Sequence, residues 1–358
     1  MSATTRIPTT DQSAATTEQG SRSPAGAGSP ADVGTAPAHR ARPGLAPSAQ
    51  RPVTVTVPDE ATRHALTVPR GVRLEVWDLT TDLPPEVAAD VDVVVVPHQA
   101  GRGTLARLRD LPRLAAVQIP SAGFEHVLRH LPEGVLLCNG RGVHDDETAE
   151  LALALTLASL RGLDDYLRAQ DRHEWTGRTR PSLADRRALV VGYGSIGGAV
   201  ARRLEAFSVD VVRVATTARD DDGVRVHGVD ELPALLPGAE IVILTVPLTP
   251  QTEGLVDADF LARLPDGALV VNVARGKVVD TGALLAELTS GRLRAALDVT
   301  EPEPLPADHP LWSAPGLILT PHEGGNTTAT PRRMLALVQA QLDRLGAGEE
   351  PVNVVART

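Results

Sequence analysis

The sequence predicts an α/β protein with two doubly wound parallel-sheet domains. Short apolar runs recur along most of the chain and alternate with helical patterns, as in sheets whose two faces are covered by helices. A glycine-rich turn lies between one such run and a helical pattern, within residues 188–206. The chain has 358 residues, which is enough for two domains.

The composition narrows the range of partners. The net charge of −10 argues against nucleic acid and against an anionic membrane surface. The single cysteine, Cys138, excludes an intramolecular disulfide and a multi-cysteine metal site, and its apolar neighbours predict a small core residue. No apolar run is long enough to cross a bilayer, and no signal peptide is visible. We therefore expect a cytoplasmic protein with no metal site.

The first domain is predicted to follow a tail. Residues 1–51 are rich in Ser, Thr, Ala, Gly and Pro and lack apolar periodicity, which is typical of a disordered segment. From residue 52 onward, short strands are separated by helical pieces. The predicted strands are Val53–Val57, Arg73–Trp77, Val91–Val96, Ala115–Ile119 and Val135–Cys138.

A long helix is predicted over Asp145–Leu160. It begins with three acids, which suit a helix N-terminus, and it contains almost no β-branched residues. Because it is apolar nearly all round, we expect it to be buried between the two domains.

The stretch Ala188–Val200 carries the strongest functional signal. An apolar strand leads into Gly192, Gly194 and Gly197, and a helix follows. In this spacing the first glycine permits a tight turn, the second lets the backbone approach a pyrophosphate, and the third lets helix and strand pack closely. Phosphates would accept hydrogen bonds from the free N–H groups at the start of the helix. The motif predicts a Rossmann-type nucleotide domain.

Further strands and a terminal helix complete the second half of the chain. The predicted strands are Val209–Ala215, Glu240–Val246, Ala268–Val273, Arg294–Val299 and Leu317–Thr320, followed by a helix over Thr328–Leu345 and a short apolar run, Val352–Val355.

Three polar residues stand just after predicted strands or in the loops that follow them. Arg275 stands where ligands of parallel sheets bind, and its planar fork suits a carboxylate or a keto oxygen. Glu303 lies between two prolines that restrict where its carboxylate points. His322 follows a proline, and a histidine near a carboxylate has a raised pKa and can donate a proton near neutrality.

Motifs along nearly all of the chain after the tail identify a family resemblance. They are Ser121–Gly123, Arg141–His144, Gly192–Gly197, Pro247–Thr252, Asn272–Val279, Leu297–Pro306, Pro310–Trp312 and Thr320–His322. Together they resemble the D-isomer-specific 2-hydroxyacid dehydrogenases. The resemblance implies an oxidoreductase that transfers a hydride between NAD(P)H and a 2-keto acid or D-2-hydroxy acid. It implies a flavodoxin-like substrate domain at 52–148, completed by 323–358, a dinucleotide-binding domain at 149–322, and a homodimer.

The resemblance also implies a role for each site residue. Arg275 would bind the substrate carboxylate and carbonyl oxygen, His322 would protonate that oxygen, and Glu303 would orient His322 and raise its pKa. Backbone N–H groups of Ala122 and Gly123 would hold the carboxylate. The cofactor would contact residues of the glycine loop and of other strand ends: Gly192, Tyr193, Gly194, Ser195, Ile196, Gly197, Val246, Pro247, Thr252, Val273 and Asp298. Asp298 would bond the carboxamide group of the cofactor.

Two positions depart from the family pattern. Glu125 stands where the family usually has Asp, and we expect little consequence. The strand that ends at Ala215 is not followed by the acid that normally binds the ribose 2′-OH of NAD. Thr216, Thr217 and Arg219 stand there and predict a preference for NADP over NAD, although the acids at 220–222 could neutralise Arg219.

Two other functions use the same fold. A formate-type dehydrogenase would carry Gln in place of Glu303, so Glu303 argues against it. A non-enzymatic, dinucleotide-sensing corepressor would keep the Arg, Glu and His, so that the sequence does not exclude it, although no basic DNA-binding patch is visible. The sequence does not identify the keto acid.

Overall fold

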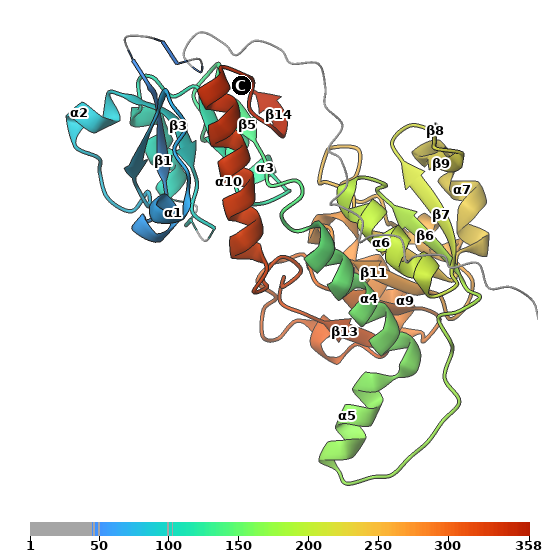
Figure 1. The fold of residues 1–358 in the computed structure, drawn as a ribbon. Helices are drawn as coiled ribbons and strands as arrows, with labels where there is room; N and C mark the ends of the chain where they lie inside the picture. The colour runs from blue at the N-terminus through green and yellow to red at the C-terminus, as the bar shows by residue number, and fades with distance from the viewer. Residues whose placement is uncertain (1–44, 46, 49–50, 99, 102) are drawn as a thin grey trace, which may run out of the picture. The chain divides into compact units, whose positions relative to one another are not determined.

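The computed structural model describes residues 45, 47–48, 51–98, 100–101 and 103–358, which belong to one compact unit spanning His39–Thr358. Most of the predicted tail lies outside the described residues. Two mostly parallel sheets with helices around them form the described fold (Figure 1). The α/β class predicted from the sequence is confirmed.

The first sheet has six strands in the order β14-β5-β4-β3-β1-β2. Its strands are β1 (Val53–Val57), β2 (Val72–Val76), β3 (Val91–Val95), β4 (Ala116–Gln118), β5 (Leu136–Cys138) and β14 (Val354–Arg357). The pairs are parallel except that β14 runs antiparallel to β5, a pairing that the sequence did not predict. Every residue of β1 and β3 is buried, as expected for central strands covered on both faces.

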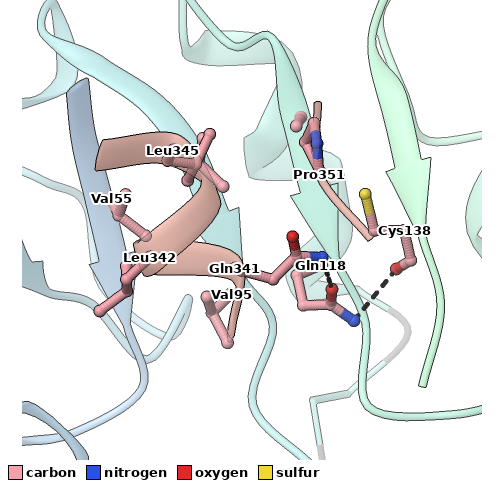
Figure 2. A pocket seen from close by; sticks show the side chains of 10 residues that line it. Val55, Val95, Gln118, Cys138, Gln341, Leu342, Leu345 and Pro351 are labelled. Carbon is pink, nitrogen blue, oxygen red and sulfur yellow. Dashed lines mark hydrogen bonds between the residues drawn. The ribbon is translucent and has the colours of Figure 1, made fainter. Parts of the chain in front are cut away.

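Helix α10 (Thr330–Ala347) packs against this sheet (Figure 1). Its Leu342 and Leu345 join the apolar core, and its buried Gln341 donates a hydrogen bond of 2.6 Å to the side-chain oxygen of Gln118 (Figure 2). The gap beside them measures only about 10 Å³, so this contact is close-packed core. Burial raises the pKa of the Cys138 thiol to about 12, in keeping with the predicted core role.

The other helices beside the first sheet are short. They are α1 (Glu60–Ala65), α2 (Pro85–Ala88), the 3-10 helix η1 (Thr104–Asp110) and α3 (Glu125–Leu128). Two of the helical pieces expected between these strands are thus a 3-10 helix, η1, and a single helical turn, α3.

The end of the predicted tail is part of the fold, which corrects the expected boundary. Leu45 is fully buried in the core of the first sheet. Arg51 donates two hydrogen bonds, of 3.1 and 2.9 Å, to the buried carboxylate of Asp92. The sequence did not reveal this because one leucine among Pro, Ala and Ser has no periodicity.

The second sheet has eight strands in the order β13-β12-β11-β10-β6-β7-β9-β8. They are β6 (Arg187–Val191), β7 (Asp210–Ala215), β8 (Arg219–Asp221), β9 (Val224–Gly228), β10 (Ile241–Leu244), β11 (Leu269–Asn272), β12 (Arg294–Leu297) and β13 (Leu317–Leu319). All pairs are parallel except β8 with β9. The β8–β9 hairpin was not predicted from the sequence, because three charged residues at a sheet edge carry no apolar strand pattern.

Helix α4 (Asp145–Arg161) packs on α6 (Ser195–Ala206) and on β11 and β12, with buried Ala and Leu side chains. Its acids make specific ion pairs: Asp146 accepts from Arg203 at 2.9 Å and from Arg333 at 2.8 Å.

The remaining helices all follow α4 in the chain and are short. They are α5 (Leu163–Asp171), α7 (Leu232–Leu235), α8 (Ala258–Ala262), α9 (Thr281–Thr289) and the 3-10 helices η2 (Val229–Glu231), η3 (Leu236–Gly238), η4 (Gly276–Val278) and η5 (Pro310–Ser313). None of the helices in the described part of the chain has the length and apolar composition needed to cross a membrane.

Candidate active site

The glycine loop joins β6 to α6 at the point where the strand order of the second sheet reverses, between β6 and β10. Gly192 has φ of +108°, which favours glycine, and a Cβ at Gly197 would lie 2.2 Å from the Gly192 carbonyl oxygen. A Cβ at Gly194, in contrast, would meet no atom within 4 Å. The chain itself therefore requires the first and third glycines, whereas Gly194 borders open space next to a helix N-terminus. This arrangement fits a pyrophosphate.

The other residues predicted to contact a cofactor fall into two groups. Ile196 and Val273 line one cavity together with Arg275 and His322. The second group, Val246, Pro247 and Thr252, follows β10 and does not line that cavity. Val246 lies next to the glycine loop, since a Cβ at Gly192 would approach its nitrogen to 2.6 Å. The Thr252 hydroxyl donates to the Pro247 carbonyl at 2.6 Å. Ser195, the first residue of α6, donates its hydroxyl to Asp145 at 3.1 Å.

Arg219 lies beside the glycine loop, beyond the end of β7. Its Nη2 donates to the Tyr193 carbonyl at 3.1 Å, and its guanidinium lies 5.9 Å from the Tyr193 ring centre. Its Nε donates to both carboxylate oxygens of Asp221, at 3.0 and 3.1 Å. Thr216 and Thr217 are exposed between β7 and Arg219. The partial neutralisation of Arg219 that the sequence left open thus takes place through Asp221.

Arg275 follows β11 and extends toward the loop that precedes α3. Its Nε donates to Glu125 at 2.9 Å and its Nη1 to the Ala274 carbonyl at 2.7 Å. A Cβ at Gly123 would lie 1.4 Å from Nη2, so any larger residue there would displace the guanidinium from this position. The side chain of Asn272 fixes the backbone turn by donating to the Arg275 carbonyl and accepting from the Ala274 N–H, both at 3.0 Å.

His322 pairs with Glu303, as the family resemblance implied. Their side chains meet at 2.7 Å between Nδ1 and Oε1. The hydrogen bond that His322 donates to Glu303 raises the pKa of His322 against the opposing effect of burial, and the same bond lowers the pKa of Glu303. Because Nδ1 is engaged, Nε2 is the nitrogen available to a ligand.

Asp298 holds the segment that carries His322. Its two carboxylate oxygens accept from the Thr320 hydroxyl at 2.6 Å and from the N–H groups of Glu323 and Gly324 at 2.8 and 2.9 Å, and its carbonyl accepts the His322 N–H at 2.7 Å. These bonds keep His322 at φ of +62°, a left-handed conformation that costs a non-glycine residue about 1–2 kcal/mol. The predicted carboxamide contact would have to use the remaining acceptor capacity of this carboxylate.

One cavity of about 220 Å³ brings most of the predicted site together. It is lined by Ala122, Gly123, Ile196, Val273, Arg275, Asp298 and His322. The N–H groups of Ala122 and Gly123 donate to no acceptor among the described residues, and the Ala122 carbonyl accepts from Asn139 at 2.7 Å. Glu303 lies behind His322, in the lining of a neighbouring cavity. A carboxylate in the first cavity would thus meet a guanidinium, two free N–H groups and an imidazole.

The sequence assigned no specific role to three further residues of this region. Glu125 contacts Arg275 directly, although its departure from the family pattern was expected to matter little. His98 and His144 line the cavity with ring centres 5.7 Å apart, and burial lowers the pKa of His144. Their signal in the sequence is weak, because an isolated histidine is more often structural. Among the described residues, no group of His, Cys, Asp and Glu side chains is arranged to hold a metal ion.

Comparison with known proteins adds an independent line of evidence. Residues 153–324 match the family model described as the NAD binding domain of D-isomer specific 2-hydroxyacid dehydrogenases. The glyoxylate reductase of Thermofilum pendens is 33% identical over 257 residues, which cover 68% of this chain and 75% of that protein.

Solved structures agree with this match. A D-isomer specific 2-hydroxyacid dehydrogenase from Xanthobacter autotrophicus Py2, in complex with NADPH and MES, superposes with a TM-score of 0.71 at 31% identity, over 86% of this chain and 98% of that one. An NADPH-dependent glyoxylate/hydroxypyruvate reductase from Sinorhizobium meliloti, in complex with NADP and sulfate, gives a TM-score of 0.72 at 27% identity, over 85% and 98% of the two chains.

Proposed function

The chain belongs to the D-isomer specific 2-hydroxyacid dehydrogenase family and is therefore an NAD(P)-dependent oxidoreductase of 2-keto and 2-hydroxy acids; from this premise we propose which residues perform its reaction. Arg275 binds the substrate carboxylate and the neighbouring carbonyl oxygen, and the N–H groups of Ala122 and Gly123 hold the carboxylate. The observation that carries the proposal is the cavity in which these groups and His322 converge.

A nicotinamide dinucleotide held at the glycine loop would supply the hydride. As the carbonyl carbon is reduced, negative charge develops on its oxygen, and a guanidinium beside that oxygen stabilises the charge. His322 donates the Nε2 proton to the same oxygen and accepts it back in the reverse reaction. Glu303, bonded to Nδ1, keeps the ring oriented and keeps it protonated to higher pH.

We further propose that the substrate is a small 2-keto acid such as glyoxylate or hydroxypyruvate. A cavity of about 220 Å³ suits a substrate of few atoms, and proteins named for reducing these two compounds are among the relatives. The test is the loss of NAD(P)H absorbance with glyoxylate, hydroxypyruvate, pyruvate and phenylpyruvate, and its gain with formate. Turnover of the smaller keto acids is expected. A protein that oxidises formate, or that binds the dinucleotide without turning over any keto acid, would contradict the assignment.

We propose NADPH as the preferred cofactor. No acid follows β7 at the position where it would repel a 2′-phosphate, and Thr216, Thr217 and Arg219 offer donors there. Two structural relatives are described with NADPH or NADP. Asp221 opposes this preference by pairing with Arg219.

We also propose a homodimer formed by the half of the chain that binds the nucleotide. Helix α5 and the segment after it expose Leu163, Leu167 and Trp175, at 47%, 62% and 103% of the reference area of each residue. Large apolar side chains clustered on one segment are typical of a protein interface. Light scattering should give twice the chain mass, and Leu167→Glu should shift the protein toward the monomer. A wild-type monomer would refute the proposal.

A further inference from the structure

In the contact between Arg275 and Glu125, each oxygen of the Glu125 carboxylate has its own hydrogen-bond partner. Glu125 is the first residue of α3, and its Oε1 accepts from Arg275 Nε at 2.9 Å. Its other oxygen accepts from the N–H of Phe124 at 2.8 Å. The carboxylate is therefore tied to its own backbone with one oxygen and to the arginine with the other. About 30% of each side chain is exposed, so the pair is only partly open to water.

The contact leaves one edge of the guanidinium for a substrate. Nε is taken by Glu125, and one hydrogen of Nη1 is taken by the Ala274 carbonyl. Nη2 lies beside Gly123 and donates to no acceptor among the described residues. An arginine binds a carboxylate through two N–H groups in fixed geometry, and rotation of the side chain would present a different pair. Glu125 thus determines which edge of the fork faces the cavity.

We propose that Glu125 is a positioning residue for Arg275, holding it through Nε so that the Nη1–Nη2 edge meets the carboxylate and carbonyl oxygen of the 2-keto acid. The inference deepens the proposed function and depends on it. Two observations argue against a competing role, in which Glu125 occupies the place of the substrate carboxylate. It bonds Nε and not the edge beside Gly123, and its second oxygen is anchored to Phe124.

The charge of Glu125 is compatible with this role. Burial works against ionisation of the carboxyl group, but the Arg275 charge and nearby N–H groups more than offset it, so that the pKa of Glu125 is lowered. The carboxylate therefore stays ionised, and the contact persists, at the neutral pH where a dehydrogenase of this family would be assayed.

The test is a double-mutant cycle on keto-acid reduction. Glu125→Ala is expected to lower kcat/KM by about 10- to 100-fold, with a clear fall in kcat, because a misplaced clamp no longer matches the transition state. Glu125→Gln keeps an acceptor for Nε and should recover part of the loss. In an Arg275→Ala background, Glu125→Ala should have little further effect, since it acts through Arg275. Glu133→Ala, which alters an exposed glutamate beyond the C-terminal end of α3, is the matched control.

The outcomes distinguish a positioning role of Glu125 from competition with the substrate carboxylate. They also distinguish failure of this inference from failure of the proposed function. A lower KM with unchanged kcat in Glu125→Ala would identify Glu125 as a competitor of the substrate and would overturn the inference. So would equal effects of Glu125→Ala with and without Arg275. If Arg275→Ala itself has no effect on keto-acid reduction, the proposed function fails instead. Dinucleotide affinity and melting temperature of Glu125→Ala should match the control, which excludes simple misfolding.

Discussion

Nδ1 of His322 lies 2.7 Å from Oε1 of Glu303, and the pair joins two loops that follow β12 and β13. The carboxylate engages Nδ1 of the ring, and His322 also lines the cavity that holds Arg275. The geometry couples the charge of Glu303 to the protonation of a ring that is itself only half-buried.

This coupling predicts the pH dependence of the reaction. Glu303 raises the pKa of His322, and keto-acid reduction needs the protonated ring, so the reductive rate should fall as pH rises through this raised pKa. Glu303→Gln removes the charge, so the fall should move to lower pH. Reductive kcat/KM measured against pH for both proteins tests this, and overlapping profiles would show that Glu303 does not tune His322.

Removal of Arg275 should abolish most of the catalysis. Arg275→Ala is expected to lose about 3 kcal/mol or more of transition-state stabilisation, roughly 100-fold in kcat/KM, because at least two charge-assisted hydrogen bonds disappear. Cofactor affinity, measured by fluorescence titration, should hardly change. Near-normal turnover would remove Arg275 from the proposed mechanism.

Two glycines of the nucleotide loop should respond differently to alanine. Gly194→Ala places its Cβ in open space, so melting temperature should stay constant while dinucleotide affinity falls. Gly197→Ala places its Cβ 2.2 Å from the Gly192 carbonyl oxygen and should lower the melting temperature as well. Thermal unfolding and cofactor titration of both variants provide the comparison. Unchanged affinity in Gly194→Ala would argue that the cofactor does not approach this glycine.

Cofactor choice should depend on Arg219 and its partner. Arg219→Ala is expected to weaken NADPH about tenfold, if one charge-assisted phosphate contact worth about 1.5 kcal/mol is lost, and to leave NADH nearly unchanged. Asp221→Asn releases Arg219 from its ion pair and should increase the preference for NADPH. The ratio of kcat/KM for the two cofactors is the measurement, and a wild-type preference for NADH would reject our interpretation of this region.

The buried end of the N-terminal segment predicts a sharp limit to truncation. Leu45→Ala should destabilise the protein by about 2–5 kcal/mol, because Leu45 is fully buried in the core of the first sheet. The exposed Ser48→Ala is the control. Deletion of 1–44 should leave the melting temperature nearly unchanged, whereas deletion of 1–50 should lower it by several degrees. Equal melting temperatures for the two truncations would contradict the packing of Leu45.

The local parts of the site could be predicted from the sequence alone. Gly192, Gly194 and Gly197 are adjacent in the chain, and their spacing between a strand and a helix already defines the turn. The apolar runs predicted most of the parallel strands, because a strand buried on both faces needs a continuous apolar stretch. Arg275 and His322 could be selected because they stand at or just beyond strand ends, where parallel sheets bind ligands.

The tertiary structure alone decided the contacts between distant segments. Glu125 and Arg275 are separated by 150 residues and meet only because two loops pack together. The hairpin that turns Arg219 toward Tyr193 consists of charged edge residues, which leave no apolar pattern to read. Leu45 is buried by a surface formed by strands and a helix from both ends of the chain. Periodicity records which face of an element is buried, but partner choice between polar side chains depends on three-dimensional packing that a linear pattern does not contain.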